Sequence, residues 1–172
     1  MSASTSGPYV EEGIVTPRTP VPVRSRSHPL LDTGGLAPAI ARLCLGLVLF
    51  AHSPQKVLGL FGGPGPQGAY AGMTSMGLAP WLAVAAIVVE ALAVIGLVLG
   101  LFTRIAALGA MAIMIGAIVT VHWPNGFFMN WMGKQAGEGF EYHILAIGLA
   151  LVCFLLGGGI VSIDRAIARS RE

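Results

Sequence analysis

Glu90 is the residue of this sequence whose position most needs a chemical explanation, because it stands in the middle of an apolar run, residues 85–95. On a helix, the positions three, four and seven residues away carry only alanine and aliphatic side chains, which cannot pair with a carboxyl group. An acidic side chain at the centre of a membrane helix is unfavourable by roughly 2.5 to 3.5 kcal/mol, so it must be protonated, paired or in contact with water. Two interpretations follow: a structural hydrogen bond to another helix, or a site for a ligand, a proton or a cofactor.

Polar side chains at the ends of the neighbouring apolar runs are candidate partners. They are His52, Gln55 and Lys56 at the end of the first run, His122 at the end of the third, and Glu138, Glu141 and His143 around the start of the fourth. Consecutive membrane helices alternate in direction, so all of these side chains arrive at the same side of a four-helix bundle. We expect them to form one polar layer there.

Helical periodicity within the first run places Arg42, His52 and Lys56 in one sector of roughly 80°. We expect that sector to face the bundle, because charged groups in membrane helices avoid lipid. Lys56 and His52 are therefore the nearest predicted partners of Glu90, and Arg42 and Arg104 are alternatives on the opposite side. A histidine or lysine beside a desolvated carboxylate can exchange a proton with it.

These considerations assign predicted roles to the polar residues. Proton handling is predicted for Glu90, His52 and His122. Ligand binding is predicted for Arg42, Gln55, Lys56 and Glu141. His143 is interpreted first as a solvated neighbour of Glu141, with membership of the site as the alternative.

The composition indicates that most of these residues meet lipid instead of water. Of the 172 residues, 55% are apolar and 10% are charged, and the mean hydropathy is +0.77. Charges are absent from residues 57–89, 91–103, 105–133 and 142–163, and each interval holds or flanks a run near the roughly 20 residues of a spanning helix. The sequence therefore predicts an all-α integral membrane four-helix bundle over residues 36–164, with helices at about 36–60, 81–101, 104–121 and 141–161.

The distribution of basic residues predicts the orientation. In a four-span topology eight arginines fall on one side, while Lys56 and Lys134 fall on the other. Positive residues gather on the cytoplasmic side, so both termini are predicted to be cytoplasmic, in the cell inner (plasma) membrane. Residues 1–35, rich in serine, proline and arginine, are predicted to be a disordered cytoplasmic tail, and residues 165–172 a short cytoplasmic one.

Several other classes of function are disfavoured by the sequence. The net charge of +2 is small and dispersed, which argues against nucleic acid. Cys44 and Cys153 have no metal-ligand spacing, and no phosphate-binding or nucleophile motif is present. No metal is expected. Haem is disfavoured because only His52 and His122 share a predicted depth.

A series of short motifs occurs in the same order as in a known family. Over about residues 37–164 the sequence resembles the DoxX family of small four-helix membrane proteins. The matching features are Arg42; His52 with Gln55-Lys56, Gly59 and Phe61-Gly62-Gly63; Gly77-Leu78; Glu90; Gly100-Leu101-Phe102-Thr103-Arg104; His122 with Gly126-Phe127-Phe128; Glu141-Tyr142; and Ser162-Ile163-Asp164. It departs from the family pattern at Ser53, where a glycine commonly follows the histidine, and at residues 157–160, which lack a basic residue before the Ser-x-Asp segment.

The resemblance implies a function in membrane redox chemistry. The family takes its name from a subunit of a thiosulfate:quinone oxidoreductase, and some relatives are linked to membrane oxidoreductase complexes. It therefore favours a non-autonomous membrane subunit of a redox complex, with other redox subunits as partners and the lipid bilayer around it. The cofactor stays open, and quinone is the candidate that the resemblance offers. Arg104 and Asp164 would be structural residues on the inner side. The alternatives are a small-solute binding or transport protein, which would form a homo-oligomer, and a scaffold without chemistry of its own.

Overall fold

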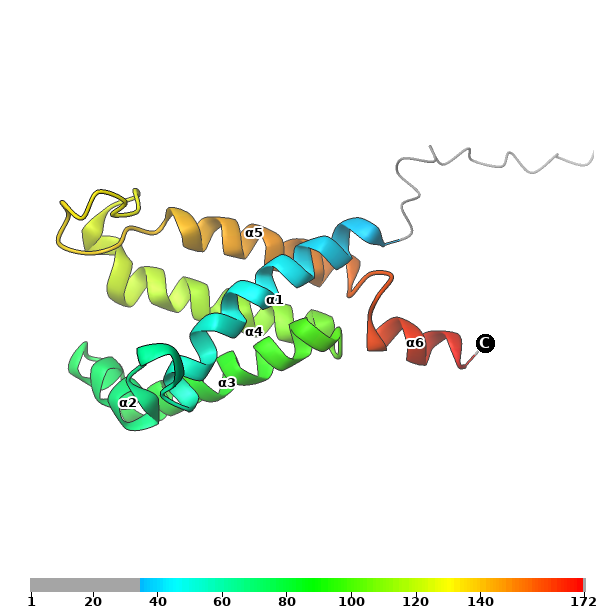
Figure 1. Ribbon diagram of the computed structural model, residues 1–172, viewed down its shortest axis with the longest axis horizontal. Helices are drawn as coiled ribbons and strands as arrows, with labels where there is room; N and C mark the ends of the chain where they lie inside the picture. The colour runs from blue at the N-terminus through cyan, green and yellow to red at the C-terminus, as the bar shows by residue number, and fades with distance from the viewer. Residues whose placement is uncertain (1–34, 172) are drawn as a thin grey trace, which may run out of the picture.

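The computed structural model describes residues 35–171. Except for Gly35, the tail predicted for residues 1–35 lies outside the described residues. Within residues 35–171 every regular element is a helix and none is a strand, which confirms the all-α prediction. In chain order the elements are α1 (Leu36–Val57), η1 (Leu60–Gly62), α2 (Gly65–Ser75), α3 (Pro80–Leu99), α4 (Thr103–Ala117), the π-helical turn η2 (Ile118–His122), η3 (Trp123–Asn125), α5 (Glu141–Leu156) and α6 (Ile163–Arg169) (Figure 1).

Three helical segments in the described part of the chain are long and apolar enough to cross a membrane. They are Leu36–Val57, Pro80–Leu99 and Thr103–Asn125, with 22, 20 and 23 residues. The protein is therefore a membrane protein in contact with lipid. Helix α5 is also apolar but has 16 residues, which at ~1.5 Å per residue gives about 24 Å, somewhat less than a hydrocarbon core of about 30 Å.

The long helices close into a ring. Helix α1 packs against α3 and α5, and α4 packs against the same two helices from the other side (Figure 1). One end of this bundle holds the C-terminus of α1, the start of α3, His122 and the start of α5, and we name it the Lys56 end. The opposite end holds the start of α1, the turn from α3 to α4 and helix α6, and we name it the Arg42 end.

Small residues bring the helices close together, as membrane helices require in the absence of a strong hydrophobic driving force. The side chains of Ala83, Ala107 and Ala150 are fully buried. At Gly96 an added Cβ would lie 2.7 Å from the Cβ of Ala106, so a larger residue would force α3 and α4 apart. Large aliphatic side chains point outward instead, with Leu47, Leu92, Val119 and Leu145 all more than half exposed.

The helices end where backbone geometry or capping stops them. Helix α1 contains Pro54 and ends at Val57, before the predicted Leu60, because Gly59 adopts a left-handed conformation at φ 70°. Helix α5 ends at Leu156 because Gly157, at φ 80°, turns the chain away. Two further helices were not expected from the sequence: α2, inside the connection after α1, and α6, in the segment that follows α5.

Candidate functional site

The buried carboxylate of α3 is paired with a lysine of α1. Lys56 Nζ donates a hydrogen bond to Glu90 Oε2 over 2.5 Å, and the two groups form an ion pair. The side chain of Glu90 is 4% exposed, whereas that of Lys56 is 32% exposed. Of the four partners considered for Glu90 from the sequence, the structure therefore brings Lys56 to it.

The pair leaves part of Glu90 unsatisfied. Its second oxygen, Oε1, is buried and has no hydrogen-bond partner among the described residues. A buried polar atom without a partner is costly, and in native proteins it usually meets water or a ligand. Glu90 therefore has an open acceptor beside its ion pair.

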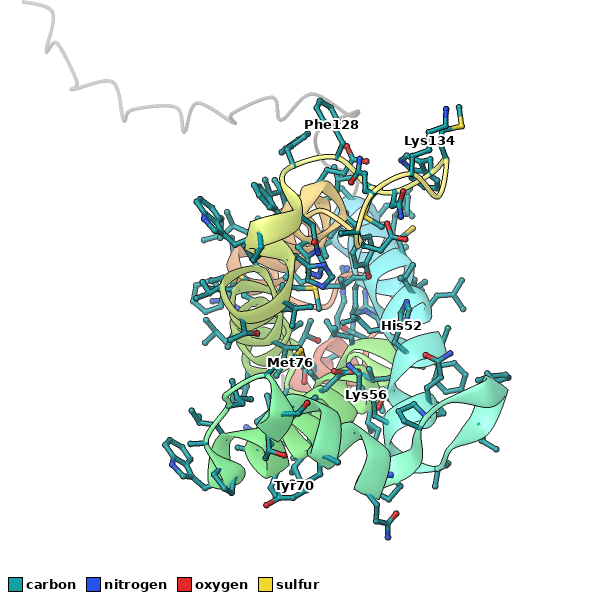
Figure 2. The ribbon with its side chains drawn as sticks, turned by 90° about the vertical axis from the view of Figure 1, so that its left-hand side faces the viewer. His52, Lys56, Tyr70, Met76, Phe128 and Lys134 are labelled. Carbon is teal, nitrogen blue, oxygen red and sulfur yellow. The ribbon has the colours of Figure 1, made fainter. Side chains whose placement is uncertain are left out.

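A cavity of about 690 Å³ adjoins this pair at the Lys56 end. Its walls come from α2, α3 and α4, with apolar side chains such as Met73, Leu82 and Ile113. Lys56, Glu90 and His122 are its only ionisable members among the residues described. Figure 2 looks toward this end of the bundle and labels Lys56 and Met76, which both line the cavity.

Two lining residues of the cavity also lie on the outer surface of the bundle. Ile115 of α4 is 52% exposed and Val119 of η2 is 69% exposed. A face of this composition meets acyl chains in a membrane. The chamber can therefore admit a ligand sideways from the bilayer, with the ion pair on its inner wall.

His122 is held in one orientation at the end of the π-helical turn. Its Nδ1 lies 2.8 Å from the carbonyl oxygen of Glu138, and because a carbonyl can only accept, Nδ1 carries the proton. The other ring nitrogen, Nε2, is then an acceptor in the neutral ring. Turns of the π type are frequent at functional sites because they redirect a side chain out of the regular helical register.

Two neighbouring residues of α5, Tyr142 and His143, join this polar region, although the sequence analysis assigned neither of them a catalytic or binding role. His143 is 6% exposed, not solvated, and its ring centroid lies 4.1 Å from that of His122. The Tyr142 ring lies 5.3 Å from the ring of His143. The sequence did contain a signal for the burial of His143. It is spaced three, seven and ten residues from Ala146, Ala150 and Cys153, and these four residues share the buried face of α5.

Three of the predicted site residues at the Lys56 end do not reach the pair. His52 is exposed, and neither its side chain nor that of Gln55 makes a hydrogen bond with any described residue. Gln55 packs its backbone closely against Gly63. Glu141 braces the loop of residues 126–140, where its Oε1 accepts hydrogen bonds from Met129 N at 3.0 Å and Trp131 Nε1 at 3.1 Å.

Arg42 lies at the opposite end of α1 from Lys56, about 21 Å away at ~1.5 Å per residue. Its guanidinium is 1% exposed and donates hydrogen bonds to backbone carbonyl oxygens of two segments. The acceptors are Leu97 at 2.5 Å, Val98 at 2.9 Å, Gly158 at 3.0 Å, and Val161. The side chain thus joins the end of α3 to the segment after α5.

Arg104 and Asp164 also bind helix ends at the Arg42 end. Arg104 Nη2 donates to the carbonyl oxygen of Leu155 over 3.2 Å, at the end of α5. The two carboxylate oxygens of Asp164 accept from the amides of Phe102 and Thr103, each over 2.8 Å. A carboxylate at the start of α4 satisfies orphan amides and favours the helix dipole.

Comparison with known proteins gives one match. The DoxX family model matches residues 37–123, about half of the chain. The matched segment runs from α1 to the start of η3 and contains Arg42, Lys56, Glu90 and His122. No curated protein and no solved structure matches the chain.

Proposed function

The chain belongs to the DoxX family, and from that membership and the cavity beside Lys56 and Glu90 we propose that it is the membrane subunit of a quinone-linked redox complex. The observation that carries this proposal is one apolar chamber that has exposed aliphatic side chains in its lining and the Lys56–Glu90 ion pair on its wall. A quinone is an apolar ring with two carbonyl oxygens and a long apolar tail. Both parts of such a molecule have a complement in this chamber.

Lys56 is suited to hold a quinone carbonyl. Its ammonium group has three N–H donors, of which one is given to Glu90. A second donor can reach into the cavity, since Lys56 lines it and is partly exposed. A cationic donor beside the carbonyl oxygen stabilises the negative charge that develops there on reduction.

Glu90 and His122 are suited to handle the protons. Reduction of a quinone to a hydroquinone takes two electrons and two protons, and each carbonyl oxygen becomes a hydroxyl. In this proposal the electrons come from a redox subunit that binds this chain. Glu90 and His122 both line the cavity, and both can pass protons at the reacting oxygens or accept hydrogen bonds from the hydroxyls formed.

The membrane setting is part of the same proposal. We place α5 across the membrane as a fourth span, tolerated by local thinning or by polar ends at the interface. Arg104, Arg165, Arg169 and Arg171 lie toward the Arg42 end, while Lys134 lies in the loop at the Lys56 end. The excess of positive charge favours a cytoplasmic Arg42 end in the inner membrane.

Photolabelling with a quinone that carries a reactive group on its ring tests this function. Membranes containing the wild-type protein should yield labelled peptides from α3 and α4, and excess unlabelled quinone should prevent the labelling. Quinone reduction by the same membranes should fall about 100-fold or more in the Glu90→Gln variant, if Glu90 transfers protons. Labelling spread evenly over all lipid-facing helices would count against a quinone site.

The mainly apolar lining does not favour a small anionic solute as the ligand. Such a solute needs a polar enclosure, because a desolvated charge must be paired or hydrated. Lys56 is the only cationic side chain at the cavity in the described residues, and Glu90 already neutralises it. We therefore retain the quinone as the ligand class.

A further inference from the structure

Three buried polar atoms at the Lys56 end have no hydrogen-bond partner among residues 35–171. They are Glu90 Oε1, the Tyr142 hydroxyl and His143 Nδ1. Native proteins rarely leave such atoms unsatisfied, and buried waters commonly bridge them. Three in one region indicate a small hydrated interior between α3 and α5.

These groups form a succession that leads away from the ion pair. Glu90 Oε1 and the Tyr142 hydroxyl are both buried and both lack a hydrogen-bond partner in the described residues. The Tyr142 ring lies 5.3 Å from the His143 ring, which lies 4.1 Å from the ring of His122. His122 in turn donates to the carbonyl oxygen of Glu138, an exposed residue of the loop 126–140.

The succession leaves the cavity lining at its two α5 members. Lys56, Glu90 and His122 line the cavity, but Tyr142 and His143 do not. The two α5 residues therefore lie outside the lining of the ligand chamber. Glu138 and Glu141 flank the far end, where their side chains bind loop backbone amides and an indole.

We propose that Tyr142 and His143 carry protons between Glu90 and the loop surface at His122, with buried water filling the gaps. This inference rests on the proposed function in assigning those protons to quinone chemistry. In each transfer the Tyr142 hydroxyl gives its proton toward Glu90 Oε1 while it takes one from the side of His143. One proton enters from water at the loop surface and one reaches Glu90, so Tyr142 and the two histidines each end with the number of protons with which they began.

Such a path would separate the entry of the ligand from the entry of protons. The ligand enters from lipid between α3 and α4, where water is scarce. Protons would pass through Tyr142 and His143, which lie outside the lining of the apolar chamber. An apolar chamber alone cannot supply protons, because it offers no chain of donors and acceptors.

The test uses a background in which Glu90 carries an observable proton. In Lys56→Met, the buried carboxyl has no counter-charge and should take up a proton. Its acid C=O stretch can be followed by infrared spectroscopy in lipid nanodiscs after a jump into D₂O, and the band is assigned by its loss in Lys56→Met/Glu90→Gln. The rate of its isotope shift measures proton access without any quinone.

Adding Tyr142→Phe or His143→Phe to this background should slow the isotope shift by about 100-fold, the order expected for loss of one positioned proton carrier. Both replacements keep an aromatic ring in the packed interior. Tyr70→Phe, the same change at an exposed tyrosine of α2, is the matched control and should leave the rate unchanged. Equal rates in Lys56→Met and Lys56→Met/Tyr142→Phe would overturn the path.

A second measurement uses the intact ion pair. Tyr142→Phe alone should slow quinone reduction by membranes while its quinone affinity stays at the wild-type value. A slowed isotope shift in a protein that binds no quinone would sustain the path and refute the quinone function. Normal quinone binding with an unchanged isotope shift and unchanged turnover in Tyr142→Phe would refute the path alone.

Discussion

Lys56 and Glu90, 34 positions apart in sequence, meet with 2.5 Å between Nζ and Oε2 and tie α1 to α3. The pair is asymmetric, because the glutamate side chain is 4% exposed and the lysine side chain is 32% exposed. The buried charge of Glu90 therefore needs Lys56 as its counter-charge, whereas the charge of Lys56 can also be solvated. The partly exposed ammonium group can also turn toward the cavity that it lines.

The asymmetry predicts unequal effects of the two single substitutions. Lys56→Met leaves a buried carboxyl unpaired and should lower the free energy of unfolding by about 3 kcal/mol. Glu90→Gln leaves a lysine that lipid headgroups and water can reach, and should cost about 1 kcal/mol. Unfolding in mixed detergent micelles measures both.

The double variant Lys56→Met/Glu90→Gln completes the cycle. Because neither partner is then left charged and buried, it should be more stable than Lys56→Met. Strictly additive effects would contradict a direct interaction. A pure scaffold would show the same stability cycle but no change in quinone binding.

The sequence was sufficient for the helical class, the membrane setting and the need for a partner of Glu90. It also placed Lys56 among the candidate partners, because Lys56 lies on the same helical face as Arg42. Helical periodicity could not show which of Lys56 and His52 pairs with Glu90. In the structure Ser53 points inward, at 5% exposed, and His52 lies on the surface. The periodicity assumes a regular helix, and Pro54 interrupts the helical hydrogen bonding beside these residues.

Other parts of the site depend on tertiary contacts that have no local signature. His143 follows Glu141 closely, which indicated a solvated residue, yet the small-residue face of α5 carries it into the bundle. Helix α2 contributes to the wall of the cavity, yet it lies in a glycine- and proline-rich connection whose composition predicts a loop. Arg42 could be recognised as buried, but its backbone acceptors come from the ends of other elements.

Arg42→Lys should destabilise the protein by about 3 kcal/mol, although it conserves the charge. A lysine cannot present the planar fork that binds carbonyl oxygens of two segments at once, so buried acceptors are left unsatisfied. Thermal unfolding in detergent measures the loss. Folded Arg42→Lys protein should bind quinone as the wild type does, and a selective loss of binding with normal stability would instead assign Arg42 to the ligand.

Asp164→Asn should weaken the start of α4 by about 1 kcal/mol. One carboxylate oxygen becomes an amide nitrogen, so only one of the two amide bonds to Phe102 and Thr103 can persist, and the favourable charge is lost. Hydrogen exchange of the first turn of α4 should increase, while the Lys56 end is unaffected. Unchanged exchange at Thr103 would contradict the capping role.

Glu141→Gln should loosen the loop 126–140. The carboxylate oxygen that accepts from Met129 N and Trp131 Nε1 loses its charge, and charge-assisted hydrogen bonds are roughly twice as strong as neutral ones. The Met129 amide should exchange faster, and the fluorescence of Trp131 should change. If Glu141 instead binds ligand, the variant will lose quinone affinity with an unaltered loop.

The central claim is that the cavity beside Lys56 and Glu90 binds a quinone, and the equilibrium Kd of a short-tailed quinone for the purified protein in nanodiscs tests it most directly. Lys56→Met should raise the Kd by about 10- to 100-fold, the equivalent of roughly 1.4 to 2.7 kcal/mol from one charged hydrogen-bond donor. His52→Gln, on the exposed face of the same helix, should leave the Kd unchanged. Equal affinities in wild type and Lys56→Met, or no saturable binding to the wild type, would contradict the account.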